Sequence, residues 1–369
     1  MTQPFTPRIE INLAKIAHNA AKLVEIYGSK NIEIMGVTKT VCGDPKIAEI
    51  FLEQGIQMLA DSKLVNLQKM RDAGIKANFI LLRSPALTEI DSVIKNADIS
   101  INTELTVITK LSEAALRSFT VQKIILMIEM GDLREGIMPE YLESFIEEVL
   151  KLKGIKIVGI GVNFACFGGV KPNEQKMNDL SKLARAVEMK FLLSLSYVSG
   201  GNSANYNWFM SADSVGRVNN LRIGESIYLG RETLNRMAIP GLYTDAFTFV
   251  TEVIELKTKP SIPYGEIGQN AFGVIPKFQD RGQMKRAVLG VGNQDILVAG
   301  LTPTLDIEIL GSSSDHTILD AKKSNLMVGD EVTFNLNYGA LLSVMTSPYV
   351  YKKYINTDLG NQDFKQTDV

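Results

Sequence analysis

Length, composition and charge restrict the possible classes of protein. The 369 residues are too many for one ordinary hydrophobic core and suit a large barrel with a smaller domain. Hydrophobic residues make up 45%, charged residues 22%, and the formal net charge is −2. These values are typical of a globular enzyme and argue against a nucleic-acid-binding or membrane-binding protein. With only two histidines, His18 and His316, we expect no metal site, and acid–base chemistry must use mainly other residue types.

The cysteines and the N-terminus indicate the compartment. Cys42 and Cys166 are the only cysteines, which does not suggest a disulfide scaffold and fits a reducing compartment. The segment MTQPFTPRIEINL lacks the basic and apolar regions of a secretory signal. No apolar run approaches the roughly 20 residues of a membrane helix. We therefore expect a cytoplasmic protein.

Between residues 31 and 224, strand-like runs alternate with helical patterns. Short Ile- and Val-rich runs that are each followed by a helix-length segment indicate parallel βαβ units. Eight such units predict a (β/α)8 barrel, and a doubly wound open sheet is the alternative. The expected strands are Ile32–Thr38, Gln57–Ala60, Asn78–Leu82, Asp98–Ile101, Lys123–Glu129, Lys156–Asn163, Leu195–Ser199 and Asn219–Arg222.

The flanking segments complete the predicted domains. PRIEINL predicts a strand, and an amphipathic helix should follow from about Leu13 to Tyr27; we assign both to the barrel domain, residues 1–240. Beyond residue 241, alternating runs such as FTFVTEVIELK and DEVTFNLN, broken by turn residues, predict a C-terminal all-β domain over residues 241–369. The tail from Asn356 is polar, and we expect its end to fray.

The predicted strand ends carry the candidate chemistry, because active sites of such barrels gather at the carboxyl ends of the strands. Strand one ends at Lys39, whose amine could form a Schiff base. Arg134 follows strand five and could donate to a phenolic or carboxylate oxygen, or form only a surface ion pair with Asp132 or Glu135.

The sixth, seventh and eighth strand ends add polar and small residues. Asn163 and Cys166 follow strand six, and we interpret Cys166 as a small buried hydrophobe. The Gly- and Ser-rich turns around Ser203 and Gly224–Glu225 follow strands seven and eight, where such barrels often bind phosphate. Tight turns alone would explain the same residues.

Taken together, these segments resemble a known family. GVTKTVCGDP, GDLREGI, GVNFACFGGV, SGGNSAN and NNLRIGESIYLGRE are similar to segments of the pyridoxal-phosphate enzymes of the alanine racemase fold, most closely the ornithine racemase branch. The resemblance covers nearly the whole chain. It implies an amino-acid racemase that acts on a small-molecule substrate. It also implies a homodimer in which each active site is shared between a barrel and the partner's β domain.

The resemblance also implies roles for individual residues. Lys39 would carry pyridoxal 5′-phosphate, Arg222 would face the pyridine nitrogen, and Arg134 would contact the phenolic oxygen. An always-protonated guanidinium beside that nitrogen would leave the ring a weaker electron sink and favour restricted proton transfer. The residues implied along the phosphate are Asn202, Ser203, Gly224 and Glu225, and those implied at the substrate are Asn163, Ser314 and Asp315.

The chain departs from alanine racemases in the second domain. Their Gly-Tyr-Ala-Asp block reads GNQD here, without the tyrosine, which argues against a strict alanine racemase. Two-base racemisation needs a base on each face of the planar carbanion, and Lys39 serves one face. We expect Asp295 or His316 to serve the other, with Tyr338 and Tyr264 as weaker candidates.

The substrate and the rival functions stay open. The preference for ornithine comes from the branch, although Asp295, Glu266 and Asp315 could pair with a terminal ammonium. The alternatives are a racemase of alanine, lysine, serine or several amino acids, and a non-catalytic pyridoxal-phosphate carrier, against which the long segment after Pro240 argues. The motifs of a decarboxylase of this fold are missing. A metal-dependent aldolase is disfavoured because both cysteines lie in the barrel.

Overall fold

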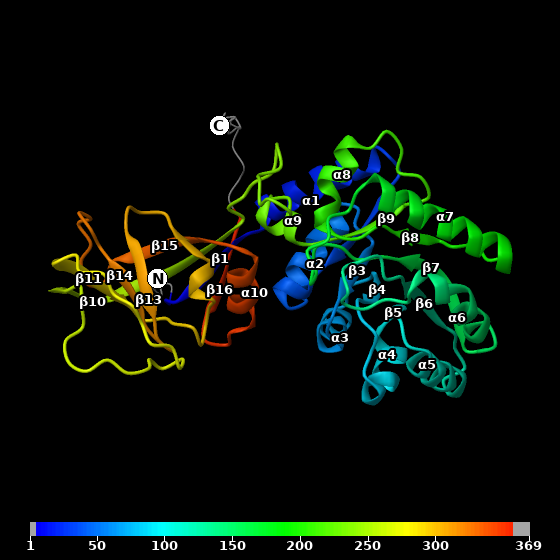
Figure 1. Ribbon diagram of the computed structural model, residues 1–369, viewed down its shortest axis with the longest axis horizontal. Coiled ribbons are helices and arrows are strands. Elements are labelled where there is room, and N and C mark those ends of the chain that lie inside the picture. Colours follow the sequence, from blue (N-terminus) through cyan, green and yellow to red (C-terminus); the bar gives the residue numbers. More distant parts are fainter. Residues whose placement is uncertain (1–4, 357–369) are drawn as a thin grey trace. The chain divides into compact units, whose positions relative to one another are not determined.

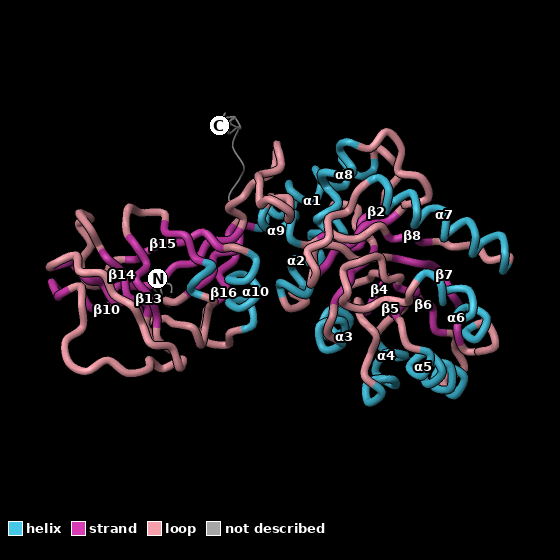
Figure 2. The backbone as a smooth tube through the Cα atoms, in the orientation of Figure 1, coloured by secondary structure: helices cyan, strands magenta, loops and turns pink. Residues whose placement is uncertain are grey.

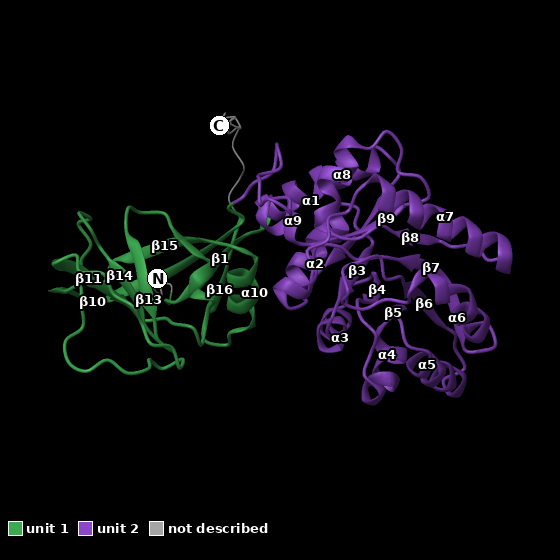
Figure 3. Ribbon diagram, viewed as in Figure 1, with its two compact units in different colours: residues 1–14, 245–360 green, residues 15–244, 361–369 purple. Residues whose placement is uncertain are grey.

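A computed structural model describes residues 5–356, which divide into two compact units (Figure 3). The barrel unit comprises residues 15–244, and the β unit comprises residues 5–14 and 245–356 of the described chain. Most of the predicted polar tail, residues 357–369, lies outside the described residues. No helix in the described part of the chain is long and apolar enough to cross a membrane.

The barrel unit is a closed ring of eight parallel strands, as predicted (Figure 1). Each predicted strand is found within a few residues of its expected bounds. In ring order the strands are β2 (Glu33–Val37), β3 (Met58–Asp61), β4 (Asn78–Leu81), β5 (Ile99–Asn102), β6 (Gln122–Met127), β7 (Ile155–Gly161), β8 (Tyr197–Ser199) and β9 (Asn220–Ile223).

Helices cover the outside of the ring (Figure 2). α2 shows why the sequence encodes them: Pro45 occupies its first turn, and the Asp44 carboxylate caps it by accepting the backbone N–H groups of Lys46 and Ile47. The helices of this unit are α1 (Leu13–Gly28), α2 (Pro45–Glu53), α3 (Leu64–Asp72), α4 (Ile90–Asn96), α5 (Leu105–Arg117), α6 (Leu142–Val149), α7 (Glu174–Phe191), α8 (Tyr206–Ser211) and α9 (Glu225–Leu229).

Strand pairing determines which side chains point into the barrel. Met35 and Val37 belong to its buried apolar core, together with Met58 and Ala60 of β3. Paired residues in a parallel sheet point to the same side, and Met35 pairs with Arg222 on β9, so Arg222 points inward. β2 ends at Val37, and Thr38 leaves the strand with φ of −95° and ψ of −5°, so Lys39 lies in the short turn that follows.

The β unit is an antiparallel sheet with one parallel pair. Its main path runs in the order β12-β15-β10-β11-β14-β13. The strands are β10 (Phe247–Pro260), β11 (Gln283–Leu289), β12 (Leu301–Pro303), β13 (Glu308–Ser312), β14 (Thr317–Asp320), β15 (Glu331–Leu336) and β16 (Tyr351–Ile355). The helix α10 (Tyr338–Thr346), which the predicted all-β pattern did not include, begins at an Asn337 cap.

The first strand, β1 (Arg8–Asn12), lies in the β unit and not in the unit to which the sequence assigned it. It pairs antiparallel with β10 and parallel with β16, and its Ile9 and Ile11 side chains are fully buried. Arg8 is also buried and forms a bidentate pair with Glu331 at 2.6 and 2.7 Å. The sequence assigned this strand to the barrel domain because it precedes the barrel directly along the chain. In the structure, strands more than 200 residues away pair with the backbone N–H and C=O groups on both of its edges.

Candidate active site

Lys39 begins a short 3₁₀ turn, Lys39–Val41, directly after the end of β2. The residue before it, Thr38, is buried and donates its hydroxyl to the Asp61 carboxylate at 2.8 Å. Cys42 closes the turn in the left-handed region, with φ of 53°. The half-buried lysine is therefore held at the carboxyl end of the barrel, where this fold carries its chemistry.

Arg222 is buried inside the barrel and has polar partners from β8 and from the end of β7. Its guanidinium donates to the Ser199 hydroxyl at 2.6 Å, to the Val162 carbonyl at 2.8 Å and to Asn163 Oδ1 at 3.4 Å. Burial, followed by the positive charge of Arg134, lowers the pKa of Arg222 to about 10. The group stays protonated at neutral pH, so it can donate a hydrogen bond but cannot supply a proton there.

Arg134 lies close enough to Arg222 to influence its charge. Its side chain forms a two-point ion pair with Glu135 and donates to the Cys166 sulfur at 2.7 Å. Partial burial opposes the charged form, but the hydrogen bonds and charge of Glu135 outweigh it and raise the pKa of Arg134. The predicted ion pair with Glu135 is present.

Cys166 is exposed, so its interpretation as a buried hydrophobe was wrong. The preceding residue, Ala165, adopts the left-handed region with φ of 49°, which turns the chain outward at this point. The thiol faces the guanidinium of Arg134 instead of the core.

Asn163 and Asn202 join the strand ends of β7 and β8. Asn163 Oδ1 accepts from the Asn202 amide at 3.2 Å as well as from Arg222. The Asn202 amide also donates to the Phe164 carbonyl at 2.9 Å, while its own oxygen caps the turn by accepting from Ala204 N. The structure thus brings Asn163, Asn202 and Arg222 into one network.

The two turns predicted to bind phosphate are hydrogen-bonded to each other. The backbone N–H of Ser226 donates to Ser203 Oγ at 3.3 Å. Gly224 precedes α9 and provides no side-chain cap. A Cβ on Gly224 would meet Val37 at 3.0 Å, so this turn packs against β2 just before Lys39. The Glu225 carboxylate pairs with Arg236, and its backbone begins α9.

These residues fit an anionic pyridine cofactor. The Ser203 oxygen accepts the Ser226 N–H, and the Ile227 N–H donates to the Gly224 carbonyl, so the Ser203 O–H is the donor that this turn can offer to an anion. Arg134 and Arg222 add two guanidinium groups, and Arg134 is paired with Glu135. Such a set suits a dianionic phosphate on one side and a ring with hydrogen-bonding atoms on the other.

The remaining predicted residues lie in two adjoining turns of the β unit. The turn after β11 contains Asp295, and the turn between β13 and β14 contains Ser314, Asp315 and His316. Backbone hydrogen bonds from Asn293 and Gln294 to the second turn hold the two side by side. At Gly292 any side chain would clash, because its Cβ would lie 2.5 Å from the Ser313 and Ser314 backbone.

Within these turns the side chains pair locally. His316 Nδ1 lies 3.0 Å from Asp315 Oδ1, and the Ser314 hydroxyl donates to the same oxygen at 3.2 Å. The His316 hydrogen bond, then that of Ser314, lowers the pKa of Asp315. Asp295 instead accepts from Ser347 Oγ at 2.8 Å. His316 also lines a hollow of about 550 Å³ in this unit.

Two residues near the arginines escaped sequence reasoning, Ser199 and Asn220, and Asp132 was considered only as an ion-pair partner of Arg134, whereas it accepts backbone N–H groups of the loop after β7. Ser199 accepts from Arg222 and donates to Asn220 Oδ1 at 2.9 Å, which extends the polar layer through the barrel. Asn220 could have been noticed, since an amide inside an apolar parallel strand needs a polar partner. Nothing in the sequence pointed to Ser199, or to backbone N–H groups as the partners of Asp132.

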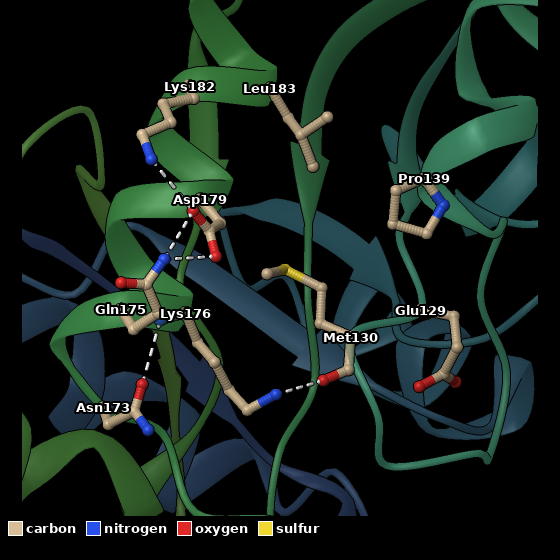
Figure 4. A pocket seen from close by; sticks show the side chains of 9 residues that line it. All are labelled: Glu129, Met130, Pro139, Asn173, Gln175, Lys176, Asp179, Lys182 and Leu183. Carbon is tan, nitrogen blue, oxygen red and sulfur yellow. Dashed lines mark hydrogen bonds and ion pairs between the residues drawn. The ribbon is translucent and has the colours of Figure 1, made fainter.

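A second hollow, of about 670 Å³, lies beside the start of α7 and does not include Lys39 or the two arginines (Figure 4). Its polar groups are satisfied largely among themselves. Gln175 donates to Asp179, and the Lys176 ammonium donates to the Met130 carbonyl at 2.7 Å. The Lys176 contact therefore holds the loop after β6 to α7.

Solved structures share the fold. An alanine racemase of Clostridium difficile 630 superimposes with a TM-score of 0.74 at 18% identity, covering 96% of this chain and 97% of that one. A D-threonine aldolase of Filomicrobium marinum does so with 0.71 at 16% identity, covering 92% and 88%. The parallel barrel with an added β unit thus has the alanine racemase fold.

Sequence comparisons identify the family. Residues 11–232 match the family described as alanine racemase, N-terminal domain. The ornithine racemase of Acetoanaerobium sticklandii is 40% identical over 353 residues, covering 95% of this chain and 99% of that protein. The lysine racemase of Thermotoga maritima is 40% identical over 350 residues, covering 94% and 98%. The chain belongs to the alanine racemase family and is an isomerase.

Proposed function

We propose that this protein is a pyridoxal-phosphate-dependent racemase of a diamino acid, with ornithine as the preferred substrate and lysine as the alternative. The observation that supports the cofactor most strongly is the buried Arg222, held by Ser199 and Val162 beside the mouth where Lys39 lies. The two relatives with similar identity support the substrate class, and they favour neither diamino acid over the other.

The barrel residues would hold the cofactor at three points. Lys39 would attach it through its amine, Arg222 would donate to the ring nitrogen, and Ser203 with the backbone of Gly224 and Glu225 would bind the phosphate. When bound, the ring withdraws electrons from the substrate's α-carbon and so acidifies the α-proton. Arg222 keeps its own proton at neutral pH, which limits this withdrawal and favours simple proton removal and return.

Two bases would exchange the α-proton. Lys39 would serve one face, and a residue from the β unit of the partner in a homodimer would serve the other. We favour His316 over Asp295, because Asp315 Oδ1 would hold the Nδ1–H of His316 in place. Nε2 would then be the nitrogen that accepts and returns the α-proton. Asp295 is half-buried and bonded to Ser347. Asn163, Ser314 and Asp315 are assigned to the substrate side.

Chemical trapping tests the attachment of the cofactor. The purified chain should be mixed with pyridoxal phosphate, reduced with borohydride and digested, and the peptide containing Lys39 should gain the mass of the reduced cofactor. Lys39→Ala should show no gain, whereas Lys76→Ala, at an exposed site just before β4, should behave as wild type. Absence of any gain at Lys39 in the wild-type protein would refute the proposal.

The substrate requires a separate panel. Single enantiomers of ornithine, lysine, alanine and serine should be incubated with the loaded enzyme and followed by optical rotation. We expect ornithine and lysine to lose rotation at least about 10-fold faster than alanine, because a buried polar pocket discriminates strongly against analogues that lack the paired group. Equal rates on alanine would contradict the diamino-acid assignment while leaving the racemase intact.

A further inference from the structure

Arg134, which would contact the cofactor ring, lies in the loop after β6 and bonds to Cys166 in the loop after β7, and both loops contain an unfavourable backbone conformation. Leu133, directly before Arg134, has φ of 52°, and Ala165, directly before Cys166, has φ of 49°. Non-glycine residues in this region cost of order 1 kcal/mol or more and persist only where neighbouring contacts hold them. The position of the Arg134 side chain therefore depends on what holds these loops.

The Asp132 carboxylate connects the two loops. It is 2% exposed and accepts the backbone N–H groups of Cys166, Phe167 and Gly168 at 3.3, 3.1 and 3.1 Å. Its main-chain carbonyl accepts Gly168 N as well, at 3.0 Å. One buried anion thus fixes three successive amides of the loop after β7 to the loop after β6.

The connection extends to both arginines. Asn163 donates to Asp132 Oδ2 at 3.5 Å and accepts from Arg222 through its own oxygen. On the other side, Arg134 lies two residues after Asp132 and donates to the Cys166 sulfur. The backbone N–H of Cys166 is the first of the three that Asp132 accepts. Asp132 is consequently linked to each guanidinium through one intermediate residue.

The segment around Asp132 is itself anchored. The Glu129 carboxylate accepts the N–H groups of Gly131 and Leu133, and Figure 4 shows the Lys176 ammonium reaching the Met130 carbonyl. Both interactions fix the backbone on either side of Asp132. The loop after β6 is thus held to the end of its own strand and to α7. Through Asp132, it in turn holds the loop after β7.

We infer that Asp132 is a positioning residue that sets the separation of Arg134 and Arg222 and thereby the fit of the cofactor ring between them. The inference rests on the proposed function, since it assumes that both arginines contact the cofactor. Asp132 touches neither cofactor nor substrate. Its effect is transmitted through the loop after β7 and through Asn163.

The substitution Asp132→Asn keeps the shape of the side chain but replaces an acceptor oxygen by a donor that faces backbone N–H groups. Amide hydrogen exchange on the full chain should accelerate about 10-fold or more at residues 166–168, before any pyridoxal phosphate is added. The affinity for pyridoxal phosphate should fall about 10-fold, and the pH midpoint of its visible absorption should shift. Asp91→Asn, at an exposed carboxylate on α4, should change none of these.

Gly168→Ala provides a second route to the same contact. Its Cβ would lie 2.7 Å from the Asp132 carbonyl, so it displaces the loop without removing a charge. It should accelerate exchange and weaken cofactor binding in the same direction, which keeps the inference testable if Asp132→Asn does not fold. Unchanged exchange at residues 166–168 in both variants would overturn it. Accelerated exchange with unchanged cofactor affinity would also overturn it, whereas a wild-type protein that itself binds no pyridoxal phosphate would overturn the proposed function.

Discussion

In the barrel, Arg222 is 6% exposed and bonded to residues from two neighbouring strand ends, whereas in the β unit the His316 side chain is 44% exposed and bonded to its sequence neighbour Asp315. The barrel mouth is fixed by contacts from far along the chain. The turns of the β unit are held to each other by backbone hydrogen bonds, and the side chains of Asp315 and His316 are largely exposed to solvent. Under the proposed function, the cofactor side is therefore preorganised, and the proton-transfer side needs a further surface to complete it.

The largest expected effect separates the two bases. His316→Asn should lower α-proton exchange from one enantiomer by about 10²- to 10⁴-fold, the usual contribution of a positioned acid–base group, and spare exchange from the other. Solvent-deuterium incorporation measured separately from the L and D substrates gives both rates. Asp295→Asn is the paired variant. If Asp295→Asn alone shows the one-sided loss, Asp295 is the base, and if neither does, the assignment to these turns is incorrect.

Removing Arg222 tests the preorganised side. Arg222→Ala leaves the Ser199 hydroxyl and Val162 carbonyl without their buried donor, so the free energy of unfolding should fall by about 2–4 kcal/mol. Urea unfolding measures the change. Arg117→Ala, which removes an exposed pair with Asp91, should stay within about 0.5 kcal/mol. A stability equal to wild type would mean that the polar layer of the barrel contributes nothing.

The turn after β8 offers a backbone test. Gly201 has φ of 135°, and a Cβ there would lie 2.3 Å from Asn205 Oδ1, which accepts the N–H of Asn202. Gly201→Ala should therefore destabilise the chain by about 1–3 kcal/mol and weaken phosphate binding. Gly74→Ala, with φ of 84° and open space, carries the conformational cost without the clash. If Gly201→Ala and Gly74→Ala lower the melting temperature equally, the predicted clash with Asn205 contributes nothing.

The smallest effect concerns the β unit. Glu331→Gln should cost about 1 kcal/mol at neutral pH, because Arg8 is buried while Glu331 is partly solvated. The hydrogen bond from Arg8 lowers the pKa of Glu331, so its contribution is complete above the usual carboxylate range and is lost as the pH falls through that lowered value. Unfolding of wild type and variant should therefore converge between about pH 5 and pH 3. Glu308→Gln, at an exposed pair, should show almost no difference at any pH.

The sequence predicts most of the barrel because parallel strands are continuous apolar runs, and each local pattern agrees with the ring that forms. It also predicts Lys39 at a strand end. It could not place β1, because pairing with β10 and β16 depends on contacts across the full chain. It missed the backbone contacts of Asp132 for a related reason. A carboxylate that accepts backbone N–H groups 34 to 36 residues away looks like any turn aspartate until the fold is known.

The parallel pairing of β1 with β16 has a consequence for biosynthesis. Ile9 and Ile11 leave the ribosome before the barrel segment, yet they remain without one of their two strand partners until residues 351–355 have been translated. The barrel segment between β1 and β16 is complete well before that point and can fold first. A change in β1 would therefore act on a late step of maturation, although its residues are made before those of the barrel.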